Sequence, residues 1–158
     1  MINIKTIKEK IFFNKNSPFK YIYFLINKLI SMFSFKKSFS QGSMDLILEH
    51  IFKTKNDGFY VDVGCQHPIK NNNTYLLYKK GWSGVNIDLD NVNIDLFNFF
   101  RPNDDNVKSA VSDKIETVKL FYYHQKSPIN TLDKKVSLKQ NAKIEKEIDI
   151  QTNTLTDI

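Results

Sequence analysis

The sequence has a single cysteine, a single tryptophan and a single arginine, and the scarcity of cysteine excludes the most. With Cys65 as the one thiol, no disulfide can form within the chain and no cysteine-based metal site is supported. The three histidines lack the spacing of metal ligands, so we expect no metal site. A chain without internal disulfides fits a reducing compartment, which favours a cytoplasmic location.

The sequence also lacks an apolar run of the roughly 20 residues that a membrane-spanning helix needs. The longest candidate, residues 19–35, is interrupted by Asn27 and Lys28, and no small-residue cleavage site of a signal peptide follows it. Helical spacing puts Lys20, Asn27, Ser31 and Ser34 on one stripe, and Ile22, Leu25, Ile26, Leu29 and Phe33 on the other side.

Two interpretations of this amphipathic segment remain open. It packs on its own domain or on a partner, or it makes a peripheral membrane contact through residues 19–37. In the second interpretation the lysines that meet anionic lipid are Lys15, Lys20, Lys28, Lys36 and Lys37.

Positive charge is concentrated at one end of the chain, whose formal net charge is +6. Residues 1–40 carry eight lysines against Glu9, whereas residues 41–158 carry 15 basic and 16 acidic side chains. A nucleic-acid-binding domain would usually carry a basic patch of its own, so we expect no nucleic-acid partner. The change in composition predicts a basic amphipathic N-terminal extension, residues 1–39, and a domain that occupies residues 40–158.

Periodicity predicts an α/β fold for this domain. Short strands are expected at 59–63, 85–89 and 107–111, and helices at 44–52, 74–80 and 94–100. A short helical pattern also covers 2–13, residues 118–123 and 147–151 are β-rich, and 134–146 reads as a solvated loop or helix. Strands that alternate with helices favour a mostly parallel sheet with βαβ crossovers.

The strongest chemical pattern is Asp62-Val63-Gly64 at the end of the first strand, with Asp88 at the end of the second. In such sheets ligands bind beyond the carboxyl ends of the strands, where a glycine lets the backbone approach a cofactor. An acidic residue that ends the next strand can accept hydrogen bonds from ribose hydroxyls. The pattern therefore indicates a nucleoside cofactor, although both aspartates could also be ordinary strand-end residues that cap turns.

A nicotinamide cofactor is less favoured than one without a pyrophosphate. The pyrophosphate fingerprint needs three glycines, whereas the loop that follows Val63 has Gly64 alone and then Pro68. S-adenosylmethionine contains no pyrophosphate, so the missing glycines weigh less against it.

Several blocks in a fixed order carry a family resemblance. They are GFYVDVG at 58–64, His67-Pro68, Asn73-Thr74-Tyr75, KGWSGVNID at 80–88, Arg101-Pro102 and AVSD at 110–113. This series resembles the FkbM family of S-adenosylmethionine-dependent methyltransferases, most clearly over 58–113 and more weakly from Ser40 to Ile158. The resemblance implies a Rossmann-like class I methyltransferase fold and methyl transfer to a hydroxyl of a sugar, glycan or natural product.

The resemblance also implies roles for individual residues. Asp62, Val63, Gly64 and Cys65 would line the methionine and ribose end of S-adenosylmethionine. Asp88 would hold the ribose hydroxyls, with Leu89, Ala110 and Val111 along the adenine. Further pocket residues would be Gln41, Asp45, Asn73 and Thr74.

The sequence departs from the family pattern at two places. Ser40-Gln41 and Asp45 match a family motif, Ser-Gln-Phe-Gly-Glu-Asp, but Gly42-Ser43-Met44 replaces its Phe-Gly-Glu, so the usual glutamate is absent. Residues 154–158 resemble the segment before the family's fourth strand, whose Asp-Val-Glu-Gly motif should come next. We therefore expect the C-terminal half of the domain to be missing.

Cys65 and His67 are the remaining candidates for chemistry. His67 leaves the cofactor loop and could act as the general base, or it could hold the loop by hydrogen bonds. A thiol–imidazole pair with Cys65 is conceivable, but a small buried Cys65 that replaces alanine fits a strand-end loop better. The alternative to an active methyltransferase is a truncated, non-catalytic fragment or a module that binds a cofactor or a partner.

Overall fold

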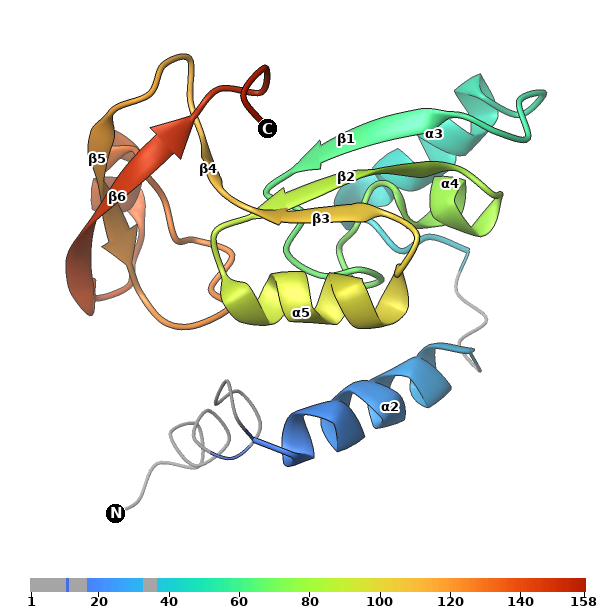
Figure 1. Ribbon diagram of the computed structural model, residues 1–158, viewed down its shortest axis with the longest axis horizontal. Helices are drawn as coiled ribbons and strands as arrows, with labels where there is room; N and C mark the ends of the chain where they lie inside the picture. Colours follow the sequence, from blue (N-terminus) through green and yellow to red (C-terminus); the bar gives the residue numbers. More distant parts are fainter. Residues whose placement is uncertain (1–10, 12–16, 33–36) are drawn as a thin grey trace.

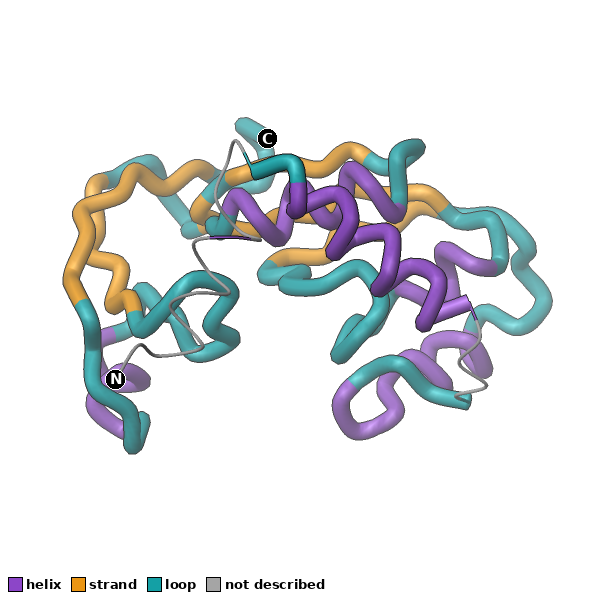
Figure 2. Tube along the Cα trace, turned by 90° about the horizontal axis from the view of Figure 1, so that it is seen from below, coloured by secondary structure: helices purple, strands orange, loops and turns teal. Residues whose placement is uncertain are grey.

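The computed structural model describes residues 11, 17–32 and 37–158. The helical pattern expected at 2–13 therefore lies outside the described residues, except for Ile11. The described part is an α/β structure with two small sheets, and Figure 2 shows the second sheet at one end of the molecule.

The first sheet is parallel and follows the order β1-β2-β3. Its strands are β1 (Phe59–Val63), β2 (Ser83–Asp88) and β3 (Asp105–Lys108), and the crossover helices are α4 (Tyr75–Lys79) and α5 (Asn91–Phe100). Figure 1 shows α5 running beneath this sheet. The expected α/β class with a mostly parallel sheet is confirmed.

Helix α3 (Met44–Ile51), which follows the short helix η1 (Gln41–Ser43), packs beside α4 at the start of β1. Buried Tyr60, Leu77 and Trp82 form the core here. Two glycines of the GFYVDVG and KGWSGVNID blocks make room for it. A Cβ on Gly58 would lie 2.5 Å from the Trp82 ring, and one on Gly84 would lie 2.2 Å from the Tyr60 carbonyl oxygen.

The second sheet has the order β4-β6-β5, with β4 (Ala110–Val111) parallel and β5 (Thr117–Tyr122) antiparallel to β6 (Lys146–Asn153). Helix α6 (Lys134–Lys139) lies between β5 and β6 in the chain. The prediction of one strand over 107–111 was wrong, because the chain changes sheets at Ser109. Its N–H donates to the Asp88 carbonyl at 3.1 Å, while its hydroxyl accepts from Asn153 Nδ2 of β6 at 2.9 Å.

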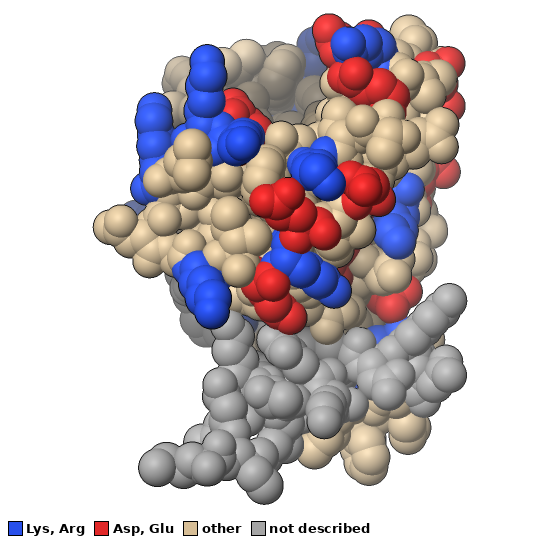
Figure 3. Space-filling view, turned by 90° about the vertical axis from the view of Figure 1, so that its left-hand side faces the viewer, with Lys and Arg blue, Asp and Glu red and all other residues tan. Residues whose placement is uncertain are grey.

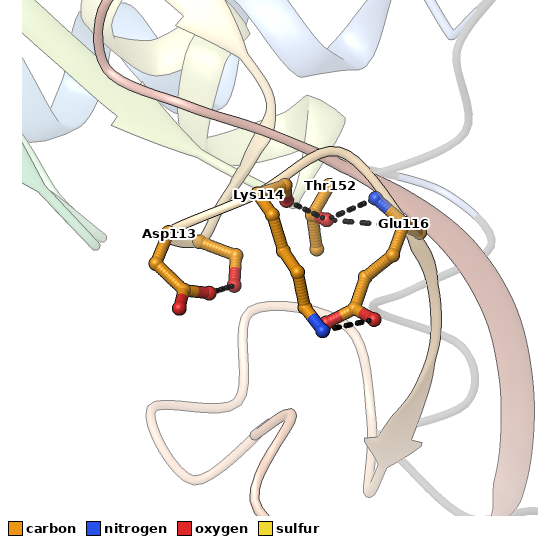
Figure 4. Close-up of polar contacts among 5 residues, drawn as sticks. Asp113, Lys114, Glu116 and Thr152 are labelled. Atoms are coloured by element: carbon orange, nitrogen blue, oxygen red, sulfur yellow. Dashed lines mark hydrogen bonds and ion pairs between the residues drawn. The ribbon is translucent and has the colours of Figure 1, made fainter.

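The turn between β4 and β5 is held by buried Thr152 of β6 (Figure 4). Its hydroxyl donates toward the carbonyl oxygens of Lys114 at 2.8 Å and Glu116 at 3.0 Å, and it accepts from the Glu116 N–H at 3.0 Å. Since Thr152 also stands opposite Ala110 in the strand register, this one residue holds the turn through its side chain and pairs with β4 through its backbone.

The face of the molecule at which β5 and β6 lie carries both signs of charge, with Lys side chains interspersed among Asp and Glu (Figure 3). Two ion pairs belong to this region, Lys119–Asp149 at 3.0 Å and Lys114–Glu116 at 3.1 Å. Exposed pairs of this kind contribute little to stability.

Helix α2 (Phe19–Met32) lies beside α5 (Figure 1). Fully buried Phe24 joins a core cluster with Val92, Leu96 and Phe100, and Lys20 Nζ binds Asp95 Oδ2 at 2.8 Å. None of the helices in the part of the chain that is described is long and apolar enough to cross a membrane.

Candidate ligand-binding cavity

A cavity of about 550 Å³ lies beyond the carboxyl ends of β1, β2 and β3, between the two sheets. The first sheet contributes the strand ends and the residues that follow them, and the second contributes Leu120, Tyr122, Ile148 and Ile150. Cavities of roughly 300–1,000 Å³ are typical of small-molecule and cofactor sites. The position is the one where open α/β sheets bind ligands.

The loop after β1 forms one edge of the cavity because it folds over the end of β2. The N–H groups of Gly64 and Cys65 both donate to the Ile87 carbonyl oxygen, at 2.8 and 3.2 Å. Gly64 has φ 74°, a left-handed conformation that favours glycine. A Cβ added there would meet nothing within 4 Å, so open space lies above the Gly64 α-carbon.

Asp88 is held in a fixed orientation at the end of β2, where it lines the cavity. Its Oδ2 accepts from the Gln66 N–H at 2.9 Å, and its Oδ1 accepts from the Asp90 N–H at 2.8 Å and from Asn93 Nδ2 at 3.1 Å. A carboxylate offers about four acceptor positions, so one remains for a ligand. Buried Asn93 also lines the cavity, and its Oδ1 has no partner among the residues described.

The structure brings six of the predicted cofactor residues together around the cavity: Val63, Gly64, Asp88, Leu89, Ala110 and Val111. The opposite wall was missed, because β5 and β6 showed only a weak pattern. The alternation Leu120, Tyr122 and Ile148, Ile150 was the available signal, since a strand presents every second side chain to one face.

Asp62, Asn73 and Thr74 do not line the cavity. The Oδ2 of Asp62 accepts from Asn72 Nδ2 at 3.1 Å and from the Thr74 hydroxyl at 2.9 Å, so Asp62 and Thr74 fix the loop that follows β1. Asn73 is exposed, and its neighbour Asn72 is the buried member of this cluster. The sequence resemblance did not single out Asn72.

Arg101 lies beneath this loop and is fully buried. Its guanidinium donates to Thr74 Oγ1 at 2.9 Å, to Asn72 Oδ1 at 2.6 Å and to the Pro68 carbonyl at 2.5 Å. The rings of Tyr78 and Phe97 each lie 5.0 Å from it, a cation–π distance. The chain's one arginine therefore holds the 68–74 loop, which in turn supports Asp62.

Gln41 and Asp45 also lie away from the cavity. Gln41 is exposed in η1, whereas Asp45 is buried and closes the turn that precedes α3. Burial by itself would raise the pKa of Asp45, but hydrogen bonds from the Phe39 N–H and from the hydroxyls of Ser38 and Ser40 outweigh it and lower the pKa. Asp45 is thus a charged carboxylate whose hydrogen bonds hold the turn that precedes α3.

The geometry of Cys65 and His67 favours structural roles for both. Burial, reinforced by Asp88 and Asp62, raises the pKa of the Cys65 thiol, which keeps it protonated. His67 Nδ1 accepts from the N–H groups of Ile69 and Lys70, both at 3.1 Å, so a neutral ring carries its proton on Nε2. Burial, with help from nearby Lys126, lowers the pKa of His67 to about 3. A ring in this state holds the loop and offers no free basic nitrogen.

Asp90 joins the start of α5 to the segment that follows β5. Its Oδ1 caps α5 through the Val92 N–H at 2.8 Å, and its Oδ2 accepts from the Lys126 N–H at 2.6 Å. The charged residues that line the cavity are Asp88, Asp90 and Lys108. In the described ranges no group of three or more His, Cys, Asp or Glu side chains could hold a metal ion.

Comparison of the chain with protein-family models, with curated proteins and with solved structures finds no match in any of the three. The resemblance to the FkbM family therefore rests on the ordered motifs alone.

Proposed function

We propose that this chain forms the cofactor-binding part of an S-adenosylmethionine-dependent methyltransferase of the FkbM type. The observation that carries the proposal is the position of Asp88 on the same cavity as Gly64 and the Ala110–Val111 strand. A carboxylate at the end of the second strand, a glycine after the first and small apolar residues after the third together suit a nucleoside.

The cavity residues fit this cofactor in charge and in shape. Asp88 keeps one acceptor position for a ribose hydroxyl, and Leu89, Ala110 and Val111 offer apolar surface to an adenine ring. The open space above Gly64 leaves room for the ligand to approach the backbone. Two carboxylates against Lys108 favour a ligand that carries positive charge.

When bound, S-adenosylmethionine would supply a methyl group to a hydroxyl oxygen of the acceptor, with S-adenosylhomocysteine as the leaving group and the hydroxyl proton released to water. The part of this chain is to orient the cofactor, because correct placement of two reactants supplies much of the acceleration in such reactions. Asp88 would hold the ribose hydroxyls, and the hydrogen bonds among Arg101, Thr74 and Asp62 hold the adjoining loop in place. The acceptor class implied by the resemblance is a hydroxyl of a sugar, a glycan or a natural product.

A cofactor-binding module without transferase activity is the second candidate. It is favoured by the state of His67 and Cys65, the two residues near the first loop that could have served as base or nucleophile. His67 uses Nδ1 to hold its own loop, and Cys65 is buried as a protonated thiol.

Calorimetric titration of the full chain with S-adenosylmethionine and with S-adenosylhomocysteine tests the proposal. We expect one-to-one binding of both, and a loss of about tenfold or more in affinity for Asp88→Ala, equivalent to at least one hydrogen bond. Asp105→Ala is the matched control, because Asp105 is exposed at the opposite end of β3. A folded chain that binds neither compound would refute the proposal.

Transfer of a labelled methyl group to sugar hydroxyls separates the two candidates. Binding together with transfer supports the methyltransferase, and binding without transfer under the same conditions supports the binding module.

A further inference from the structure

Helix α2 turns its apolar side outward. Seven large apolar residues of this helix are between 47% and 63% exposed: Phe19, Tyr21, Ile22, Leu25, Ile26, Leu29 and Ile30. At 100° per residue they occupy one continuous side of the helix. Contiguous exposed apolar surface of this kind marks an interaction site in a folded protein.

The opposite side of α2 is fixed to the rest of the protein. Phe24 is fully buried against α5, with its ring centroid 5.8 Å from that of Phe99. Lys20 is buried and bound to Asp95, and Lys28 Nζ lies 5.3 Å from the centroid of the Phe99 ring. The side of α2 that carries Lys20 and Phe24 thus faces α5, so the exposed apolar side cannot be covered by rotation of the helix.

The charge of the sequence on both sides of α2 indicates what binds its exposed apolar side. No acidic residue stands between Glu9 and Asp45, whereas six lysines do. Lys15 precedes Phe19 by four residues, and exposed Lys37 follows Met32 by five. A segment of five residues spans at most about 18 Å, so Lys37 lies within that distance of the end of α2.

We propose that the outward side of α2 docks the protein on an anionic phospholipid surface, with the helix axis parallel to the membrane. An apolar helix side flanked by lysines is the composition of interfacial helices. The helix lies on the bilayer because its other side is packed on α5. Lys20 is not part of the lipid contact, contrary to the sequence-based expectation, because it is buried and paired with Asp95.

A second copy of the chain is the competing occupant. A two-fold pair of α2 helices would bury the same apolar residues, but it would also bring the lysine-rich flanks of both copies together. Like charges that meet across an interface oppose association of two copies. The same lysines are attracted to an anionic membrane surface. The proposal does not depend on the methyltransferase assignment.

Vesicle flotation of the full chain tests the proposal. We expect the protein to float with vesicles that contain phosphatidylserine in phosphatidylcholine, and to float far less with phosphatidylcholine alone or in high salt. The combined variant Ile22→Ser, Ile26→Ser, Leu29→Ser should reduce the bound fraction about tenfold. Its matched control is Ile115→Ser, Val136→Ser, Leu138→Ser, which removes exposed apolar residues outside α2 and should bind like the unaltered chain.

The charge contribution is tested by Lys36→Gln with Lys37→Gln, compared with Lys134→Gln with Lys135→Gln on α6. The first pair should weaken binding to anionic vesicles roughly tenfold, and the second should leave it unchanged. Circular dichroism confirms that each variant is folded. No flotation of the folded chain, or an equal loss in variant and control, would overturn the proposal. So would a dimer, seen by light scattering, that the α2 variant dissociates while neither protein binds vesicles.

Discussion

At His67 the hydrogen bonds decide what the imidazole can do. Both donors to Nδ1 are backbone N–H groups of the turn that the ring itself holds, Ile69 and Lys70. Burial disfavours the charged ring, and nearby cations, above all Lys126, lower the pKa of His67 further. Protonation of Nδ1 would also remove the two accepted hydrogen bonds. The same contacts that disqualify His67 as a base make it a stabilising residue at neutral pH.

This arrangement predicts a pH-dependent contribution to stability. As the pH falls below 6.5, the ordinary value, His67 becomes protonated in the unfolded chain first, because its pKa in the folded protein is about 3. The unfolded state then binds more protons than the native state, so the free energy of unfolding decreases through this window. In His67→Gln that contribution is absent, and stability should fall less steeply between pH 6.5 and about 3. Urea unfolding at a series of pH values measures the difference.

The protonation of His67 can also be measured directly. The ring carbon resonances of His67 in the native protein should stay at their neutral positions through most of the same window. Titration of the ring near its ordinary pKa of 6.5, together with equal pH slopes for the two proteins, would contradict the prediction.

At the scale of helices and strands, the segments that form β5 and β6 could be recognised as β-rich, but the pairing of the second sheet and the division of 107–111 between β3 and β4 could not be predicted. The strands that end at Val63 and Asp88 are short apolar runs bounded by turn residues, and this local signal is sufficient to place the cavity. The pairing of Ala110 with Thr152 joins residues 42 positions apart, and two-residue β4 carries no pattern of its own. Partners so distant are chosen by tertiary contacts, which a local pattern does not contain.

Because a local pattern contains no tertiary contacts, two details of the structure also differ from what the sequence predicted. Asn72 and Asn73 are adjacent and chemically identical, and which of them is buried depends on the position of Arg101, 28 or more residues further along the chain. The amphipathic pattern of α2 likewise defined two sides of the helix, but the Lys20–Asp95 contact decides which side faces inward.

The contribution of the Thr152 hydroxyl to stability can be predicted. Thr152→Val keeps the side-chain shape and removes the hydroxyl, which leaves the Glu116 N–H without this acceptor and the carbonyl oxygens of Lys114 and Glu116 without its proton. We expect a loss of about 1–3 kcal/mol in the free energy of unfolding, the usual cost of buried polar groups that lose a partner. Urea unfolding compares it with Thr117→Val, an exposed threonine at the start of β5. Equal stability of the two variants would rule out a role for Thr152 in the turn.

At the scale of the whole molecule, the cavity is the place where the two sheets meet. Residues 63–66 and 87–93 form one side of it, and residues from 120 to 150 form another. Links between the sides are the bond from the Lys126 N–H to Asp90 Oδ2, at the start of α5, and the bonds of Ser109 to Asp88 and Asn153. A ligand that fills the cavity should therefore stabilise both sides together, since any opening of the second sheet would remove part of its binding surface.

Hydrogen exchange can test this coupling with S-adenosylhomocysteine as the probe. Under the proposed function, saturating ligand should slow exchange at the amides of Gln66 and Ala110, and also at Lys126 and Ser127, which are remote in sequence from the first sheet. Helix α3 does not line the cavity and serves as the internal control, with little change expected. Asp88→Ala at the same ligand concentration should lose the protection at all four positions. If the ligand binds but protects Gln66 and Ala110 alone, the segment between β5 and α6 is not a wall of the occupied site, and the two sides of the cavity are not coupled through it.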